Sequence, residues 1–317
     1  MILITGSAGF IGFHLALFYL KKNKKVIGID NLNNYYDVKY KHDRLKILKK
    51  YKNFIFIKID LKNKSSLKKL DKFGKKIENV IHLAGQAGVR FSIINPSTYI
   101  KNNIEAYIYL LEYFRLKKNI KSILYASSSS IYGDTNHKNL KSENMISVYA
   151  VSKKTLEHIS SVYNHIYKMN FIGMRFFTVY GPYGRPDMSI FKFFNNIQNN
   201  KKIDIYNFGN HSRSFTYISD IVENIDRLID HTNKKKKTFN EIVNIGNPKS
   251  VALKYVINLI EKKFNKKIKK KFHPLQVGDI IKTEANISDE QKTYKFKFKI
   301  NIKEGIDNFF EWFSSEK

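Results

Sequence analysis

The stretch that decides the fold is residues 1–12, which read MILITGSAGFIG. The branched apolar run Ile2 to Ile4 predicts a short buried strand, and Gly6, Gly9 and Gly12 follow where a helical pattern begins. Glycine lets the backbone turn sharply and approach a pyrophosphate, whose charge then lies against the free amides of a helix N-terminus. We therefore expect a strand, a tight turn and a helix that bind a dinucleotide. A purely structural turn is the alternative for the glycines taken alone.

The first twenty residues contain no Lys, Arg, Asp or Glu, so a membrane span or a signal peptide has to be considered. A signal peptide carries positive charge ahead of its apolar run, and none precedes Ile2 here. The glycines also interrupt the apolar stretch. We therefore expect neither feature, and no membrane as a partner.

Beyond this segment, short apolar runs alternate with helical patterns, which is typical of βαβ units. The predicted fold class is α/β, a doubly wound parallel sheet with a smaller mixed α/β part. The expected strands are Ile2 to Ile4, Val26 to Ile29, Phe54 to Ile57, Val80 to Leu83, Ile123 to Tyr125 and Phe171 to Arg175.

The rhythm changes after about Tyr180, where glycines and prolines crowd into residues 181–186. We expect a nucleotide-binding domain over 1–180 and a mainly substrate-binding domain over 181–317. The two domains are expected to be interleaved near 215–247, because a helical pattern and the buried-strand pattern of Ile242 to Ile245 return there.

Composition excludes several classes of protein. With 317 residues, 43% of them hydrophobic, the chain can bury a sizeable core, and without cysteine it has neither disulfides nor a thiol nucleophile. Such a chain fits a reducing compartment, so we expect the cytoplasm. The formal net charge of +30 comes mostly from lysine, 50 of the 57 basic residues. This indicates solvated surfaces, so we expect no specific nucleic-acid partner. His14, His82 and His158 lack metal-ligand spacing, so no metal is expected and they are interpreted as structural.

Asp30 ends the second expected strand, about 20 residues past the glycines. An acidic side chain at this place hydrogen-bonds the ribose hydroxyls of a bound dinucleotide. Its neighbour is Asn31, and no basic residue is adjacent to receive a 2′-phosphate, so NAD is favoured over NADP. A turn-forming aspartate at a strand end is the alternative.

Tyr149 and Lys153 lie four residues apart, hence on one face of a predicted helix. A phenol is a poor base at neutral pH, but a neighbouring ammonium favours the phenolate. The serines at 127–130 follow a strand and supply hydroxyls for a reacting oxygen. A Tyr and a Lys at this spacing also occur by chance in a chain with 50 lysines and 20 tyrosines, and a plain serine-rich loop is the alternative for the serines.

At this point the chain resembles the extended short-chain dehydrogenases/reductases, and among them the nucleotide-sugar epimerases of the UDP-glucuronate 4-epimerase kind. The resemblance covers essentially the whole chain and implies a Rossmann-type first domain and a homodimer. The matching motifs are residues 82–90 (HLAGQAGVR), 125–133 (YASSSSIYG), 175–182 (RFFTVYGP), 184–188 (GRPDM) and Gly278-Asp279.

The resemblance implies roles for individual residues. Four of the seven arginines, at 90, 175, 185 and 213, fall in matched motifs, where a planar bidentate fork has a use. The implied catalytic residues are Ser128, Tyr149 and Lys153. The implied NAD-binding residues are Gly6, Gly9, Phe10, Ile11, Gly12, Asp30, Asn31, Asp60, Leu61, Leu83, Ala84, Gly85, Asn102, Tyr149 and Lys153. The implied residues for the UDP-sugar are Arg90, Ser127, Ser128, Thr178 and Arg185, with Arg213 near the diphosphate and Asp279 near the uridine ribose.

The implied reaction is epimerisation at C4 of UDP-glucuronate through a transient 4-keto sugar, with NAD retained. A C4 ketone is β to the C6 carboxylate and can lose CO2, so Arg185 is the expected guard of that carboxylate; a plain salt bridge is the alternative. Decarboxylases and 4,6-dehydratases of the superfamily resemble this chain but carry an acidic residue where it has Ser129 and Ser130. The other open alternatives are a UDP-glucose or UDP-N-acetylglucosamine 4-epimerase, which has asparagine at the Thr178 site, and an inactive NAD- or RNA-binding protein.

Overall fold

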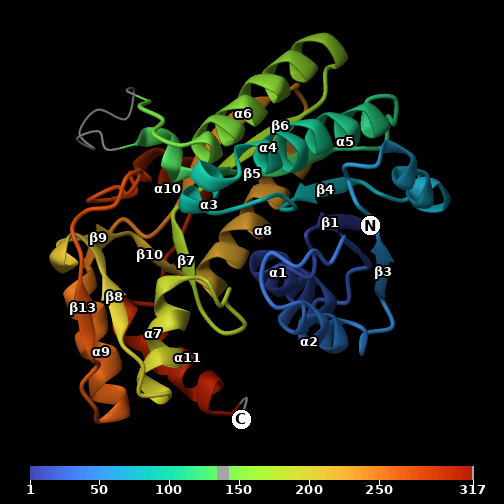
Figure 1. Ribbon diagram of the computed structural model, residues 1–317. Helices are drawn as coiled ribbons and strands as arrows, with labels where there is room; N and C mark the ends of the chain where they lie inside the picture. Colours follow the sequence, from blue (N-terminus) through green and yellow to red (C-terminus); the bar gives the residue numbers. More distant parts are fainter. Residues whose placement is uncertain (134–142, 316–317) are drawn as a thin grey trace.

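The computed structural model describes residues 1–133 and 143–315 and centres on one parallel sheet of seven strands (Figure 1). The strand order is β11-β6-β5-β4-β1-β2-β3, which confirms the predicted doubly wound sheet. Every predicted strand is present. The bounds are β1 Ile2–Thr5, β2 Val26–Asp30, β3 Phe54–Lys58, β4 Asn79–His82, β5 Ser122–Ser128, β6 Phe171–Phe176 and β11 Asn240–Ile245.

Alternation along the strands divides the core into two layers. Ile2 and Ile4 of β1 pack into one cluster, whereas Leu3, between them, packs into the other. The helices α1 (Phe10–Lys21), α2 (Lys39–Leu48) and α8 (Ile218–Lys234) cover the first face. The second face carries the 3₁₀ helix η1 (Lys64–Phe73), α5 (Ala106–Phe114) and α6 (Val148–Tyr167). Apolar residues on both sides of each strand explain why the strands read as continuous apolar runs.

The order of the strands reverses between β1 and β4. From β1 the chain builds outward through β2 to β3, then returns to pair β4 with the free side of β1. In such sheets the crevice beyond the carboxyl ends at the reversal is the usual ligand site. The segments that leave β1, β2, β4 and β5 all run into this crevice.

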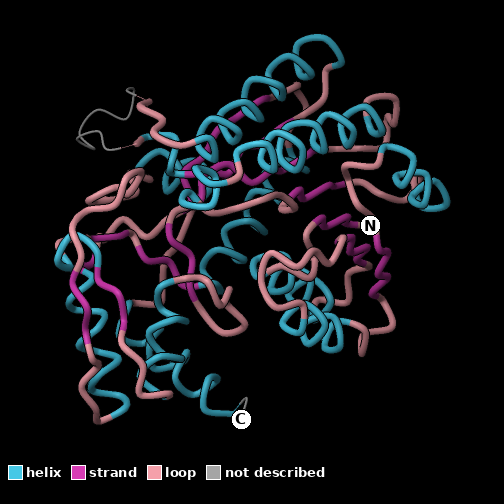
Figure 2. The backbone as a smooth tube through the Cα atoms, viewed as in Figure 1, coloured by secondary structure: helices cyan, strands magenta, loops and turns pink. Residues whose placement is uncertain are grey.

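The second part of the chain consists of helices with small two-stranded sheets. β7 (Thr178–Tyr180) pairs with β10 (Phe215–Tyr217), β8 (Ile203–Ile205) with β13 (Lys270–Phe272), and β9 (Ser212–Arg213) with β12 (Val251–Ala252). The helices are α7 (Ser189–Gln198), α9 (Leu253–Phe264), α10 (Ser288–Tyr294) and α11 (Ile302–Ser315). Long loops join these elements, and α7, α9 and α11 lie together beside the first half (Figure 2). Two elements from the later part of the sequence belong to the first half of the structure, because α8 packs on α1 and β11 pairs with β6 at the edge of the large sheet.

Several side chains pack away from the cavity, among them His82, which was predicted to be structural. Tyr107 and Phe114 of α5 are buried, while the hydroxyl of Tyr113 donates to Asp71. His82 is buried beside Thr5 and stacks on Tyr107, and burial lowers its pKa to about 3, so it stays neutral. Among the described residues, no helix is long and apolar enough to cross a membrane.

Candidate active site

One cavity of about 870 Å³ lies over the carboxyl edge of the sheet, and all the predicted site residues line it. They come from segments that follow β1, β2, β3, β4, β5 and β7, from α6, and from the loops of the second part. The sequence thus identified residues that the fold brings together across more than 270 positions of the chain.

The glycine turn has the shape that a dinucleotide requires. Gly6 has φ +70°, and a Cβ on Gly12 would lie 2.1 Å from the carbonyl oxygen of Gly6, so neither position accepts a side chain. α1 begins directly after Gly9, and no side chain caps its first amides. Those amides, with the positive end of the helix dipole, fit a pyrophosphate. The cradle that Gly6, Gly9 and Gly12 leave therefore fits NAD.

Asp30 lies at the end of β2, buried at the cavity wall. Its two carboxylate oxygens accept the backbone amides of Ala8 (3.1 Å) and Leu32 (2.8 Å), which fixes the carboxylate beside the glycine turn. One prediction needs correction here, because a basic residue does reach this region. Lys41, from α2, lines the cavity and donates to the carbonyl and the side-chain oxygen of Asn33. Burial lowers the pKa of Lys41, and the charge of Asp30 opposes that fall.

Tyr149 and Lys153 occupy successive turns of α6 facing the cavity. The Nζ of Lys153 donates to the carbonyl of Ala126 (2.9 Å), and burial lowers its pKa to about 8. Burial raises the pKa of Tyr149, and a hydrogen bond with Ser128 opposes that rise. Ser128 ends β5, and its Oγ also accepts the amide of Ser130 (3.1 Å). A phenol, a hydroxyl and an ammonium thus converge on one end of the cavity, as proton transfer to a bound alcohol would require.

A short π-helix, η2 (Ile100–Glu105), lies between α4 (Pro96–Tyr99) and α5. The wider turn gives two adjacent asparagines different tasks. Asn102 lines the cavity, whereas Asn103 is buried and holds both backbone groups of Gln86 and the hydroxyl of Ser152. Asn103 thereby fixes the segment after β4 to α6.

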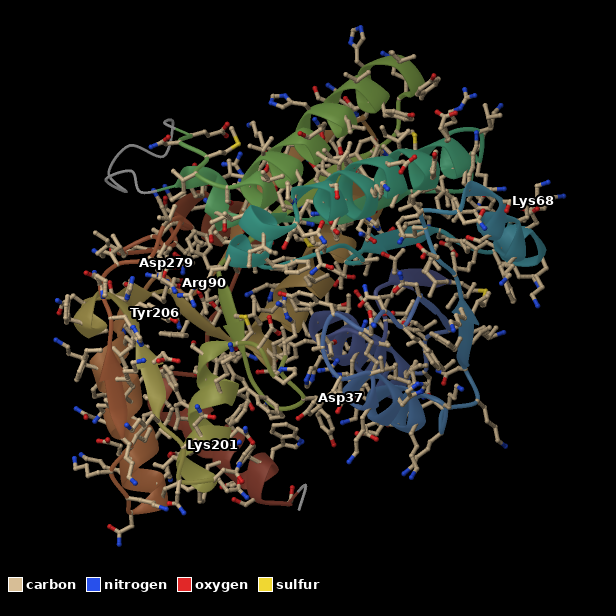
Figure 3. The ribbon with its side chains drawn as sticks, in the orientation of Figure 1. Asp37, Lys68, Arg90, Lys201, Tyr206 and Asp279 are labelled. Atoms are coloured by element: carbon tan, nitrogen blue, oxygen red, sulfur yellow. The ribbon has the colours of Figure 1, made fainter. Side chains whose placement is uncertain are left out.

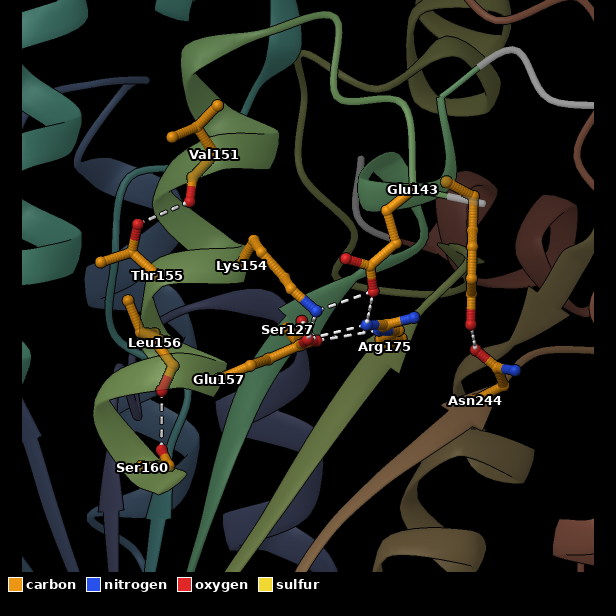
Figure 4. A network of polar contacts seen from close by, with 11 residues as sticks. Ser127, Glu143, Val151, Lys154, Thr155, Leu156, Glu157, Ser160, Arg175 and Asn244 are labelled. Atoms are coloured by element: carbon orange, nitrogen blue, oxygen red, sulfur yellow. Dashed lines mark hydrogen bonds and ion pairs between the residues drawn. The ribbon is translucent and has the colours of Figure 1, made fainter. Parts of the chain in front are cut away.

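The serine run divides between the cavity and the core beneath it (Figure 4). Ser127 also lines the cavity, but its hydroxyl donates to Glu157 (2.7 Å), inside a buried cluster with Arg175. Arg175 donates through Nε and Nη2 to Glu157, and through Nη2 to Glu143. Arg175 and Ser127 therefore support the floor of the cavity, and we no longer assign the Ser127 hydroxyl to the sugar.

Arg185 reaches the cavity from the loop after β7. Its Nε donates to Asp187 Oδ1 (3.0 Å) and its Nη2 to Asp187 Oδ2, which is a two-point pair. The Asp187 carboxylate outweighs desolvation and raises the pKa of Arg185, while Arg185 holds the pKa of Asp187 below its usual value against the effect of burial. The guanidinium also lies 5.7 Å from the ring of Tyr35.

A second group of polar residues that line the cavity includes Arg90, Tyr206 and Asp279, which lie close together (Figure 3). Arg90 donates to Asp279 (2.8 Å), and its guanidinium stacks over the ring of Tyr206 at 4.4 Å. Arg213 donates to the carbonyls of Ser212 and Ile281. These cations and rings face the cavity together, which suits a flat base and a charged diphosphate.

Sequence reasoning missed several residues of the cavity. Tyr35 follows β2 at the carboxyl edge, a position that could have marked it. Lys192 and Tyr206 belong to the second part, where no strand pattern shows which residues turn inward. The other unpredicted residues that line the cavity include Lys41, Gln86, Asp187 and His211.

Comparisons with known proteins agree with this geometry. The family model "NAD dependent epimerase/dehydratase family" matches residues 2–246. An uncharacterized protein of Methanocaldococcus jannaschii is 48% identical over 100% of this chain and 97% of its own length. The UDP-glucuronate 4-epimerase of Thermodesulfobacterium geofontis is 40% identical over 98% of this chain and 95% of its own.

A solved structure extends the match to three dimensions. The UDP-glucuronic acid 4-epimerase of Bacillus cereus, in complex with UDP-glucuronic acid and NAD, superposes with a TM-score of 0.92 at 30% identity. The match covers 100% of this chain and 99% of that one. The chain therefore belongs to the NAD-dependent epimerase/dehydratase family, which confirms the predicted enzyme class and its cofactor.

Proposed function

We propose that the protein is a UDP-glucuronate 4-epimerase, which interconverts UDP-glucuronate and UDP-galacturonate. The observation that carries this proposal is the guanidinium of Arg185 in the same cavity as Ser128, Tyr149 and Lys153. A guanidinium fork matches a carboxylate at two points, and C6 of a hexuronic acid lies two carbons from the reacting C4. The full-length similarity to UDP-glucuronate 4-epimerases supports the same substrate.

The roles of the chain's own residues follow from their chemistry. Tyr149 as phenolate removes the proton of the C4 hydroxyl, and Ser128 holds that oxygen by a hydrogen bond. Lys153, one turn along α6, favours the phenolate through its charge. NAD, when bound, accepts the C4 hydride and returns it to the opposite face. Tyr149 then returns the proton to the new alcohol, so neither proton nor hydride is lost.

Arg185 is proposed to keep the keto acid intact. Loss of CO2 is fastest when the breaking C5–C6 bond lies parallel to the π orbitals of the C4 carbonyl. A guanidinium that holds the carboxylate at two points fixes the position of C6, and so keeps the C5–C6 bond close to the plane of the C4 carbonyl and out of line with those orbitals. Ser129 and Ser130 line the cavity where decarboxylases and dehydratases carry an acidic residue, so no carboxyl group assists cleavage there.

One observation favours a second candidate, a 4-epimerase of neutral UDP-sugars. Asp187 already occupies two donors of Arg185, so the pair offers a substrate less positive charge than an unpaired arginine would. A sugar that bears a hydroxymethyl group would leave that pair undisturbed. Thr178, in place of asparagine, weighs against this candidate.

The deciding experiment incubates the purified protein, without added NAD, with UDP-glucuronate and separately with UDP-glucose. Products are separated by anion-exchange chromatography with mass detection, and Tyr149→Phe serves as the inactive control. An isomer of unchanged mass from UDP-glucuronate alone is the expected result. A product lighter by the mass of CO2 favours the decarboxylase, and turnover of UDP-glucose favours the neutral-sugar epimerase. If there is no turnover even with NAD added, the inactive-protein alternative gains ground.

Two further proposals concern the state of the protein in the cell. We propose a homodimer, which the family resemblance implies and for which α6 offers a surface. Val151, Val162 and Ile166 are exposed on one face of this helix, at the spacing of an apolar stripe. Sedimentation of the wild type against Ile166→Glu tests this proposal. The cytoplasm remains the proposed location, because the chain has no cysteine.

A further inference from the structure

Arg44, which belongs to no motif used so far, is among the largest fully buried side chains of the protein. It lies on α2 and is 1% exposed. Its guanidinium donates to the carbonyl of Ala8 (2.9 Å) and to the hydroxyl of Tyr36 (2.8 Å). It also donates to two carbonyls of the loop after β7, that of Tyr183 through Nε and Nη2 (3.1 and 2.8 Å) and that of Gly184 through Nη2 (3.1 Å).

These contacts join two distant segments. Ala8 belongs to the glycine turn, and Tyr183 and Gly184 directly precede Arg185. In the first half of the chain, α1 and α2 lie next to this loop (Figure 1). From α1, His14 adds a third tie, because its Nε2 donates to the carbonyl of Pro182 (2.7 Å). Three consecutive carbonyls of the loop are thus held by side chains of the nucleotide-binding half.

The loop needs this support. Tyr183 has φ 54°, a left-handed conformation that a bulky side chain rarely adopts, and such a conformation persists only where surrounding contacts impose it. At Gly184 a Cβ would lie 2.9 Å from the carbonyl of Gly181, so the loop is also closely folded on itself. The ring of Tyr183 packs against Phe13 at 5.0 Å.

Arg44 is also chemically unusual. In the part of the chain that the structure describes, no carboxylate forms a salt bridge with it, although buried charges are normally paired. All five of its N–H groups are instead accounted for by oxygen atoms of three segments. A lysine carries only three donors, all on one nitrogen, and cannot reproduce these five directed hydrogen bonds.

We propose that Arg44 is a positioning residue that fastens the Arg185 loop to the glycine turn, and so fixes Arg185 relative to the cofactor and the sugar. Resting on the proposed function, this makes Arg44 a residue that keeps epimerisation free of decarboxylation. When the fastening is loosened, Arg185 no longer holds the carboxylate out of the reactive orientation. The C5–C6 bond of the keto acid then breaks, its electron pair moves to the C4 carbonyl as an enolate, CO2 leaves and C5 takes a proton from water. The hydride removed from C4 stays on the cofactor.

The test compares Arg44→Lys with the wild type and with a matched control, Arg115→Lys. Arg115 lies at the end of α5 and pairs with Glu112 at the surface, away from the cavity. Two measurements are made on each purified holoenzyme: the ratio of isomer to decarboxylated product from UDP-glucuronate, and amide hydrogen exchange of residues 181–188 without sugar. His14→Ala is the second variant should Arg44→Lys not fold. It removes the hydrogen bond to Pro182 and the ring contacts of His14, including the one with Tyr183, at a half-buried position.

We expect Arg44→Lys to slow epimerisation by about 10²-fold, as a small misplacement of a positioned group does. We also expect it to release the decarboxylated product and to exchange faster over 181–188, whereas Arg115→Lys behaves as the wild type. His14→Ala should change both readouts in the same direction by a smaller factor. An unchanged product ratio or unchanged exchange would overturn the proposal and leave Arg44 as a stabilising residue only. A wild type inert toward UDP-glucuronate would contradict the proposed function, and the exchange comparison would still decide whether Arg44 fastens the loop.

Discussion

Two of the guanidinium–carboxylate pairs of the site differ in their surroundings, because one lies beneath the cavity and the other at its wall. In the lower pair, the side chains of Arg175 and Glu157 are 8% and 4% exposed. Ser127, Glu143 and Lys154 also belong to this cluster. In the upper pair, Arg185 and Asp187 are 19% and 29% exposed and belong to one loop. The first pair is enclosed by β5, β6 and α6, whereas the second is reached through the cavity.

The difference shows that chemistry alone does not identify a binding arginine. Both arginines fall in motifs of the resemblance, and both make the same two-point contact. Replacing a partner of the lower pair leaves a buried charge with fewer contacts, which costs stability. The partner of the upper pair can be exchanged for a ligand carboxylate without unfolding anything. The degree of burial therefore distinguishes Arg175, which stabilises the fold, from Arg185, which is proposed to bind the sugar.

The largest effect is expected from Glu157→Gln. Among the residues that the structure describes, the change leaves the buried Arg175 with Glu143 as its one carboxylate partner, and we expect the free energy of unfolding to fall by about 4 kcal/mol. Urea unfolding followed by circular dichroism measures it. The control is Glu112→Gln, which removes a half-exposed partner of Arg115 and should cost less than about 1 kcal/mol. Equal losses for the two variants would show that enclosure does not distinguish the pairs.

Arg185→Ala should lower the activity and leave the stability almost unchanged, in contrast to Glu157→Gln. We expect UDP-glucuronate epimerisation to fall by about 10²- to 10³-fold, with CO2 loss as the main remaining reaction, because the carboxylate loses its two-point partner. The midpoint of urea unfolding should shift little. Product analysis and unfolding on the same preparation check both parts. A stable variant that still epimerises UDP-glucuronate at the wild-type rate would remove Arg185 from the site.

Lys153 is a buried cation of the site. Unlike Arg175 and Arg185, it forms no salt bridge among the described residues. Its pKa is about 8 in the folded protein against about 10.4 when unfolded. Between these values the unfolded chain binds more protons, so stability should rise with pH through this window. In protein freed of cofactor, the stability of the wild type relative to Lys153→Met should rise by about 2 kcal/mol from pH 8 to pH 10. A difference that does not change with pH would mean that Lys153 keeps its proton.

The smallest effect is expected from Asp187→Asn, which removes the charge that competes for Arg185. The KM for UDP-glucuronate should fall by about 3- to 10-fold, the size of a partly exposed pair. The inhibition constant of UDP-glucose, which has no carboxylate and is added as a competitor of UDP-glucuronate, should stay constant and serves as the control. A rise in the KM for UDP-glucuronate would instead mean that Asp187 orients Arg185.

Sequence patterns predicted those features of the site that residues close together in the chain determine. The glycine turn, Asp30 at a strand end, and Tyr149 one turn before Lys153 each follow from local spacing. Local spacing did not show that Ser127 turns its hydroxyl to Glu157, because four serines in a row give no direction. Nor did it reveal Lys41, which enters the cavity through the packing of α2.

The second part of the chain was less predictable for a physical reason. Its strands are only two or three residues long, too short for an alternation of apolar and polar residues to be recognised. Lys192 and Tyr206 line the cavity there without a pattern that marks them. The resemblance identified Asp279 through the specific motif Gly278-Asp279, and Arg213 through the match along the whole chain.

The π-helical turn at Ile100–Glu105 limits how this segment can change in length. A π turn holds one more residue than an α turn over the same rise. Deleting one residue here would restore α geometry and rotate the preceding asparagines by about 100° relative to α5. Asn102 would leave the cavity and Asn103 would lose Gln86 and Ser152, although every other side chain of the segment was retained. Point substitutions on the outer face of this segment should therefore be tolerated, whereas deletion of a single residue should not. Related chains should keep the length of this segment even where its amino-acid sequence differs.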